Sequence, residues 1–385
     1  MKSIVTIVIA ALHSISIAYS QDEMYHYKTL KKHIEPINAV AFSPDGKYLL
    51  SGSDDKTMVL WDIENETVLN EYPGDHKKFH TVDFMSNGEE IIAGVGNKLK
   101  IYPKAGGTPL VLSGHGTFIW SFQMTKDETR GVSGSLDPGF WYWDLEENKP
   151  IVQLKGHEES TMAVAISQDG KYLASGSRDM KIVIWEADSQ KIKHSFKAHS
   201  DNIYSLAFTP DSKYLLSASR DGSIKLWDVE TGEKIHTYNR HTKPVMCISI
   251  SPDGRHFLSA SLDETIRLWE ISNGKCLYTY IDHEGPVNTV RYSPDGKYFA
   301  SGSNDNTVIV WSIGKRVVAE YYYSDEIAEE MNTTNLFKPK QKGEKKDEYQ
   351  ARMEKAEKIR NELYDKYYKK YLEEIPVEPI KQVGN

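Results

Sequence analysis

Four residues, His, Ser, Asp and Trp, recur together along this chain, and this repeat constrains the fold more than any other feature. In each copy the Ser follows the His by 18 residues, the Asp by 22 and the Trp by 28, and the last four copies repeat every 42 residues. A period of this length is typical of supersecondary units that stack to share one core. The six copies are His33, Ser51, Asp55, Trp61; His115, Ser133, Asp137, Trp143; His157, Ser175, Asp179, Trp185; His199, Ser217, Asp221, Trp227; His241, Ser259, Asp263, Trp269; and His283, Ser301, Asp305, Trp311.

Each unit has the pattern of four short strands. In the unit that follows His241, the apolar run Val245–Ile250 ends at the turn sequence Ser-Pro-Asp-Gly over 251–254, where Pro presets φ and Gly tolerates a positive φ. Two further strands are predicted at His256–Ser261 and 265–269, and Cys276–Tyr280 closes the unit. Four strands without helical periodicity predict a small antiparallel sheet, which is one blade of a β-propeller.

Two dipeptides in each unit carry a family resemblance. Gly156-His157 with Trp185-Glu186, and Ala198-His199 with Trp227-Asp228, resemble the Gly-His and Trp-Asp pairs of WD40-repeat proteins. The resemblance covers about 290 residues of the chain. It implies that the four repeated residues are hydrogen-bonded together inside each blade. Side-chain chemistry agrees, because a buried imidazole, hydroxyl, carboxylate and indole need mutual partners.

Ser, His and Asp are also the members of a hydrolase triad, so a catalytic interpretation has to be weighed. A nucleophile is needed once, whereas this set occurs six times at the same spacing. We therefore interpret the four residues as structural tetrads and assign no catalytic residue.

The units number seven, and the second is degenerate. His76 is present, but Tyr102 stands in place of Trp, and residues 93–97 replace the Ser and Asp. The fold class is thus all-β, a seven-bladed WD40-type β-propeller over residues 21–323. Two segments compete to close the ring: 25–31, which family practice favours, and 317–323, which would otherwise leave the ring as a departing strand.

The N-terminus has the pattern of a secretory signal peptide over 1–20. Lys2 gives a positive charge, residues 4–12 are apolar apart from Thr6, and Ala18-Tyr19-Ser20 fits a cleavage site after Ser20. We expect a secreted or periplasmic protein with no integral membrane segment after cleavage, since the apolar core is too short to span a bilayer. The alternative is that this segment is a buried N-terminal strand.

Composition limits the ligands. A net charge of −8 and a pI near 5.9 argue against nucleic acid as a main partner. No Cys/His cluster has metal-ligand spacing, and we expect no cofactor and no metal site. The two cysteines, Cys247 and Cys276, fall on the first and fourth strands of one blade, about 14 Å apart, so no disulfide is expected.

Function is then expected on the loop face of the ring. In WD40-like propellers three positions per blade project there: the third and fifth after the repeat His, and the residue before the turn Asp. Such side chains are enriched at interface anchors, and we expect them to bind a protein or peptide. The alternative is that several of them tuck between blades and plug the channel mouth. These candidate partner-binding residues are Phe118, Trp120, Leu136, Met162, Arg178, Tyr204, Arg220, Met246 and Leu262.

After the propeller the composition changes. Residues 324–346 are predicted to be a polar, basic linker, 347–375 an amphipathic helix, and 376–385 a tail. The apolar positions of the helix are mostly three or four apart, which predicts a Tyr-rich stripe. That stripe has three possible environments: the side of the propeller, another helix, or solvent. Its members are Tyr349, Met353, Ala356, Leu363, Tyr367 and Tyr371.

Two function classes remain. The first is a noncatalytic WD40 scaffold that binds a protein or peptide outside the cytoplasm. The second is a propeller enzyme, a hydrolase or lyase, with its active site at the channel mouth. An enzyme would need unique acid, base or metal-binding residues near the axis, and none stands out in the sequence.

Overall fold

The computed structural model describes residues 26–312 and 315–374. Residues 26–312 form a ring of strands and residues 315–374 form a helical unit, and each is described by itself. The predicted signal peptide at 1–20 and the tail at 376–385 lie outside the described residues.

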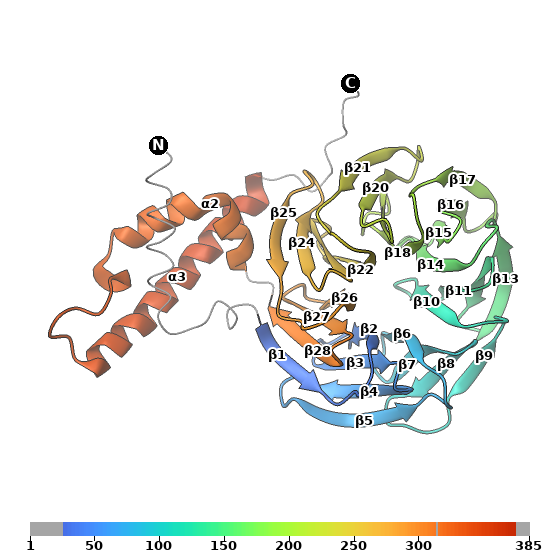
Figure 1. The fold of residues 1–385 in the computed structure, drawn as a ribbon, viewed down its shortest axis with the longest axis horizontal. Coiled ribbons are helices and arrows are strands. Elements are labelled where there is room, and N and C mark those ends of the chain that lie inside the picture. Colours follow the sequence, from blue (N-terminus) through green and yellow to red (C-terminus); the bar gives the residue numbers. More distant parts are fainter. Residues whose placement is uncertain (1–25, 313–314, 375–385) are drawn as a thin grey trace. The chain divides into compact units, whose positions relative to one another are not determined.

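Within residues 26–312 the strands form seven four-stranded blades (Figure 1). Five are separate sheets, and an eight-stranded sheet consists of two blades joined by the pair Ser135 and Thr161. Blades one to three contain β2 (Ile37–Phe42), β3 (Tyr48–Ser53), β4 (Thr57–Asp62), β5 (Thr67–Pro73); β6 (Phe79–Phe84), β7 (Glu90–Val95), β8 (Lys98–Pro103), β9 (Leu110–Ser113); and β10 (Ile119–Met124), β11 (Arg130–Ser135), β12 (Gly139–Asp144), β13 (Lys149–Lys155). Blades four to six contain β14 (Thr161–Ile166), β15 (Tyr172–Ser177), β16 (Lys181–Glu186), β17 (Ile192–Lys197); β18 (Ile203–Phe208), β19 (Tyr214–Ser219), β20 (Ile224–Asp228), β21 (Lys234–Tyr238); and β22 (Val245–Ile250), β23 (His256–Ser261), β24 (Ile266–Glu270), β25 (Cys276–Tyr280).

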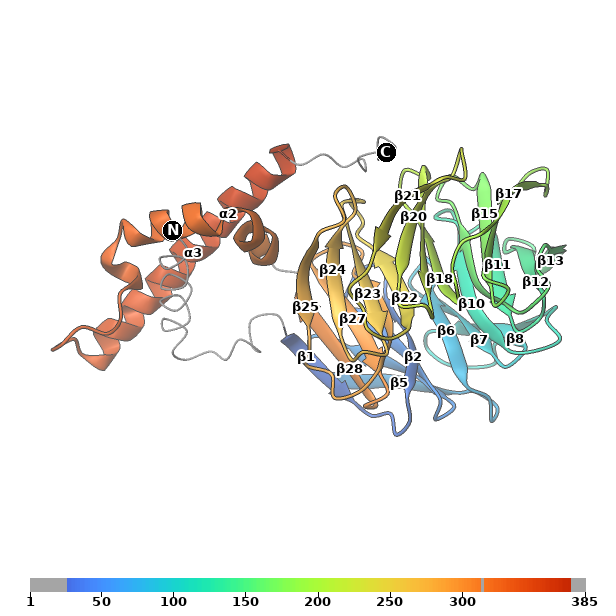
Figure 2. The same cartoon turned by 45° about the horizontal axis from the view of Figure 1, so that its top comes forward.

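The seventh blade closes the ring with a strand from the N-terminal side. It contains β26 (Val287–Tyr292), β27 (Tyr298–Ser303) and β28 (Thr307–Ser312), and its fourth strand is β1 (His26–Lys31), which is hydrogen-bonded to β28. The N-terminal alternative for ring closure is therefore confirmed. Figure 2 shows the same ring tilted, with turns joining the strands at its two faces.

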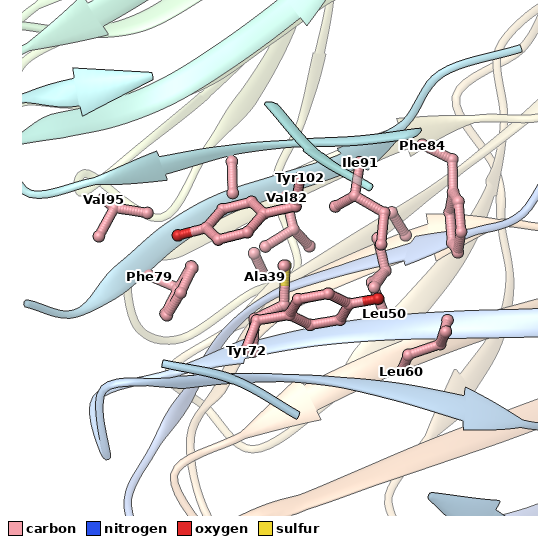
Figure 3. Packing of buried hydrophobic residues seen from close by; sticks show 13 residues of the cluster. Ala39, Leu50, Leu60, Tyr72, Phe79, Val82, Phe84, Ile91, Val95 and Tyr102 are labelled. Carbon is pink, nitrogen blue, oxygen red and sulfur yellow. The ribbon is translucent and has the colours of Figure 1, made fainter. Parts of the chain in front are cut away.

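Apolar side chains fill the spaces between neighbouring blades. Between blades one and two the core includes Leu50 and Tyr72 on one side and Phe79, Ile91 and Tyr102 on the other (Figure 3). The Tyr72 and Tyr102 rings meet edge to face, with centroids 5.6 Å apart. Because each face of a blade packs on its neighbour, the strand residues read as near-continuous buried runs, such as β14 and β19.

The repeated residues form hydrogen-bonded tetrads, as predicted. In blade five, His199 Nδ1 lies 3.0 Å from Asp221 Oδ2 and its Nε2 lies 2.8 Å from Ser217 Oγ. The indole N–H of Trp227 donates to the same hydroxyl oxygen at 2.8 Å. Blades one, four and six share this arrangement, and in blade seven His283 makes the same two contacts with Asp305 and Ser301.

A fifth member of the network was not predicted from the sequence. Two residues after the Asp, a hydroxyl donates to the carboxylate at 2.6 or 2.7 Å, as Thr57 does to Asp55. The same position is filled by Ser223, Thr265 and Thr307. The recurrence of Ser or Thr two residues after the Asp would have revealed this fifth member in the sequence.

Blade three keeps only part of the tetrad. His115 Nε2 and the Trp143 indole both meet Ser133 Oγ, at 2.6 and 2.7 Å, but His115 Nδ1 lies 3.7 Å from Asp137 and has no hydrogen bond. Gly139 occupies the position of the fifth hydroxyl. Burial lowers the pKa of His115 to about 4.

Blade two differs from the sequence interpretation. The residue four before its first strand, where the other blades have the repeat His, is Asp75, and His76 is exposed. Asp75 pairs with the buried Lys100. Tyr102 takes the place of Trp, as expected, and its buried hydroxyl has no hydrogen-bond partner among the residues that the structure describes. An ion pair therefore replaces the tetrad in this blade.

Residues 315–374 form two helices in place of the expected departing strand and linker. α2 (Lys315–Asn332) covers 317–323 and the first part of the predicted linker, 324–332, and a 3-10 turn, η2 (Asn335–Phe337), follows it. The strand expectation failed because the Val-Val and Tyr-Tyr-Tyr residues of this segment have high strand propensity but pack here on a second helix. A kink at Tyr323 interrupts α2.

The predicted C-terminal helix is confirmed as α3 (Lys346–Glu374). Of the three possible environments for its Tyr-rich stripe, the structure has another helix: α3 pairs with α2. Tyr364 donates to Glu320 and Tyr367 to Glu330, both at 2.6 Å, and Ala356 and Tyr371 are also buried. Tyr349, Met353 and Leu363 are half-buried.

Candidate functional site

The innermost strand of every blade contains a β-bulge after its first residue. In β2, for example, Ile37 and Ala39 face consecutive residues of β3, so Asn38 has no residue opposite it. A bulge leaves its extra residue unpaired and redirects its side chain. The seven bulge residues are Asn38, His80, Trp120, Met162, Tyr204, Met246 and Asn288.

In six of the seven blades, a backbone hydrogen bond holds a turn residue next to the bulge. The backbone N–H of Arg178, for example, donates to Ser160 O in the loop that enters β14, and that of Leu136 donates to Phe118 O. We call the seven bulge residues and these turn residues the mouth residues. The turn residues are Asp54, Leu136, Arg178, Arg220, Leu262 and Asn304.

A cavity of about 350 Å³ lies at the axis of the ring among the mouth residues. Residues from all seven blades line it, including Trp120, Tyr204 and Met246 among the predicted residues, together with Asn38 and Asn288. This volume is near the lower end of the range for ligand pockets. The cavity therefore has room for one or two side chains of a partner.

The predicted partner-binding residues take different positions. Trp120, Tyr204 and Met246 are half-buried in the cavity wall, whereas Phe118 is 42% exposed. Leu136 and Leu262 are half-buried, and Arg178 and Arg220 are exposed. Met162 is 2% exposed and so fits the alternative that a mouth side chain tucks between blades.

Half of the mouth is polar, which the sequence interpretation missed. Asn38 donates to Asp54 at 2.7 Å, and Asn288 donates to Asn304 at 2.8 Å and to Ile37 O at 2.9 Å. Lys78 pairs with Asp54. The asparagines and Asp54 stand at the same offsets in blades one and seven as the predicted residues do in blades three to six, and those offsets would have revealed them in the sequence.

His80 joins the two halves of the mouth. Its ring stacks on Trp120, with centroids 4.7 Å apart and planes 18° apart. Burial lowers the pKa of His80, and the nearby Asp54 opposes that shift. The neutral imidazole is therefore favoured, and it extends the aromatic wall of the cavity.

Charged residues occur deeper along the inner strands, and the sequence did not single them out. A second cavity of about 470 Å³ is lined by Asp83, Lys126, Ser249 and Arg291. Burial raises the pKa of Asp83 to about 6, although Arg291 acts in the opposite direction. Asp83 and Arg291 stand where other blades have Ala41, Gln123, Ala165, Ala207 and Ser249, so they are unique within the repeat.

The described residues contain neither a metal-ligand cluster nor a membrane-spanning helix. Among residues 26–312 and 315–374, no group of three or more His, Cys, Asp or Glu side chains is placed to hold a metal ion. In the same residues, no helix combines the length and apolar character needed to cross a bilayer. Cys247 and Cys276 are both free, as predicted.

Comparison with known families identifies five of the seven units. The family model described as WD domain, G-beta repeat, matches residues 24–62, 148–186, 190–228, 232–270 and 274–312. These are units one and four to seven, in which His contacts both Ser and Asp. The two unmatched units are the ones in which the structure lacks the His–Asp hydrogen bond.

Curated relatives share parts of the chain. A guanine nucleotide-binding protein subunit beta of Schizosaccharomyces pombe is 31% identical over 134 residues, which are 34% of this chain and 44% of that protein. A ribosome biogenesis protein WDR12 homolog of Culex quinquefasciatus is 32% identical over 141 residues, 35% of this chain and 33% of that protein. The general transcriptional corepressor TUP1 of Saccharomyces cerevisiae is 26% identical over 235 residues, 34% of this chain and 33% of that protein. The chain spans less than half the length of each.

Proposed function

This chain belongs to the WD40-repeat family, and we propose that it works as a noncatalytic platform that binds a protein or peptide at the mouth residues. The observation that carries the proposal is the cavity, where Trp120, Tyr204 and Met246 form an apolar wall. Aromatic, Met and Arg side chains are the ones enriched at the centres of interfaces. The tetrads support the proposal because the His, Ser and Asp of each complete unit are engaged in structural hydrogen bonds.

If the apolar wall binds the partner, removing its aromatic side chains should abolish binding. The chain is used to capture partners from its native cell by proximity labelling, and the capture is repeated with Trp120→Ala and Tyr204→Ala. We expect both variants to lose the same partner while their melting temperatures stay within a few degrees of the wild type. Ile192→Ala is the matched control, because Ile192 is 49% exposed on the outer strand β17. Retention of every partner by both mouth variants would defeat the proposal.

We also propose that the protein acts outside the cytoplasm, in the periplasm or as a secreted protein. The support is the sequence of residues 1–20, with Lys2 before an apolar core and Ala18-Tyr19-Ser20 at its end. N-terminal mass spectrometry of the protein from its native cell should find Gln21 as the first residue. A mature protein that begins at Met1 would contradict export.

The second candidate function is a propeller enzyme, and one observation favours it. Asp83 and Arg291 are unique within the repeat and line one cavity, and the raised pKa of Asp83 is of the kind that acid–base catalysis uses. Asp83→Asn separates the two functions. It should leave partner capture intact, and the enzyme proposal requires that it abolish turnover in a panel of hydrolase and lyase substrates.

A further inference from the structure

The two halves of the mouth differ in chemistry: one is polar and the other is apolar. On the side of blades seven and one, the amide groups of Asn38 and Asn288 are engaged with Asp54, Asn304 and backbone oxygens, at 2.7 to 3.3 Å. These polar groups satisfy one another, so a partner gains little by displacing them. The side of blades three to six is different, because its bulge residues are aromatic or Met.

A cation stands beside the apolar half without a partner. Arg178 is exposed, and its guanidinium makes no hydrogen bond or ion pair with any residue in the described parts of the chain. Among the described residues, the guanidinium of Arg220, at the same offset in the next blade, has one long contact of 3.8 Å, with Asp201. The neighbouring carboxylate of Glu158 pairs instead with Lys181, at 3.2 Å.

Both features point to the same kind of partner. A guanidinium binds a carboxylate through two parallel hydrogen bonds, and such a pair strengthens where apolar walls exclude water. The cavity of about 350 Å³ accepts a side chain, not a folded domain. A segment that places one large apolar side chain in the cavity would hold its neighbouring residues over the turns that carry Arg178 and Arg220.

We propose that the mouth takes an extended protein segment in which an aromatic or large aliphatic residue is flanked by Asp or Glu. The apolar side chain enters between Trp120, Tyr204 and Met246, and the carboxylate pairs with Arg178, assisted by Arg220. The inference rests on the proposed function and adds the chemistry of the partner to it.

The probe is a phage-displayed library of random peptides about twelve residues long, selected on the full chain. We expect the enriched peptides to carry Asp or Glu within two positions of an aromatic or large aliphatic residue. Selection on the Arg178→Gln, Arg220→Gln double variant should keep the apolar residue and lose the acidic one. Selection on Trp120→Ala should lose both.

Affinities of the best peptide are then measured by fluorescence polarisation. Arg178→Gln should weaken binding about three- to tenfold, the range for one partly shielded ion pair. Raising the salt concentration should weaken wild-type binding more than binding by that variant. Arg255→Gln is the matched control, because Arg255 follows the turn at the other end of β22, and its affinity should equal that of the wild type.

The outcomes separate this inference from the function on which it rests. Peptides that need Trp120 and Tyr204 but carry no acidic residue would overturn the inference and leave the binding function standing. Enriched peptides that bind Trp120→Ala and Tyr204→Ala as well as the wild type would overturn both.

Discussion

Replacing Ser217 by Ala tests whether the tetrads are structural. Ser217 is fully buried, and its hydroxyl oxygen accepts from the Trp227 indole at 2.8 Å while its O–H faces His199 Nε2 at 2.8 Å. Burial lowers the pKa of His199, so the ring is neutral and Nε2 accepts a hydrogen bond while Nδ1 donates to Asp221. The substitution therefore strands one donor and one acceptor in the core of blade five.

The expected cost follows from these two stranded groups. Each buried polar group without a partner costs about 1 to 3 kcal/mol, so Ser217→Ala should lower the free energy of unfolding by about 3 kcal/mol. At about 2 to 4 °C per kcal/mol for a domain of this size, the melting temperature should fall by about 6 to 12 °C. Ser189→Ala is the control, because Ser189 is exposed, and we expect a change within about 0.5 kcal/mol.

Urea and thermal unfolding followed by circular dichroism measure both variants. A double-mutant cycle with Trp227→Phe isolates the mechanism, because without the indole N–H the Ser217→Ala change strands only His199. The cost of Ser217→Ala should then be about 1 to 2 kcal/mol smaller than in the wild type. A fall of less than about 1 °C in the single variant, or an unchanged cost in the Trp227→Phe background, would refute the reasoning.

Three further predictions follow from the described contacts. The free energy of unfolding, measured by urea titration, should fall between about pH 6.5 and pH 4, because burial lowers the folded-state pKa of His115 to about 4 and the unfolded chain takes up the proton first; a constant value across this window would contradict it. Deleting β1 removes the fourth strand of blade seven, so a chain that begins at residue 33 should unfold cooperatively at a much lower temperature in calorimetry; an unshifted transition would show that ring closure does not depend on it. Gly302→Ala should destabilise the ring by about 1 to 3 kcal/mol, because a Cβ there would lie 2.4 Å from Ile37 Cγ2 across the junction of blades seven and one; a melting temperature equal to or above that of the wild type would show that the junction yields.

Much of the fold could be predicted because each unit repeats the same local chemistry. The tetrad spacing determined the blade, and the offsets from the repeat His located the mouth residues in blades three to six. The prediction failed where the local pattern was broken. In blade two, the position of the repeat His, 14 residues after the preceding Trp61 and four before β6, is filled by Asp75, and the neighbouring His76 is exposed.

The charged pair of the second cavity depended on residues that no repeat rule selects. Asp83 and Arg291 come from distant parts of the sequence, and they share a cavity because closure of the ring brings blades two and seven to either side of blade one. The helical unit likewise gave an ambiguous local signal: 317–323 has strand-forming residues, but the segment is helical where it pairs with α3.

The sequence alone determined that seven four-stranded units share a core, because the short apolar runs, the turn chemistry and the tetrad are all local and recur with the period of the repeat. Tertiary structure alone decided which strand closes the ring, which mouth residues satisfy one another, and that the Arg178 guanidinium has no partner among the described residues. The reason is physical: a hydrogen bond or ion pair between neighbouring blades depends on distances set by the closed ring, and the order of residues along one blade does not encode those distances.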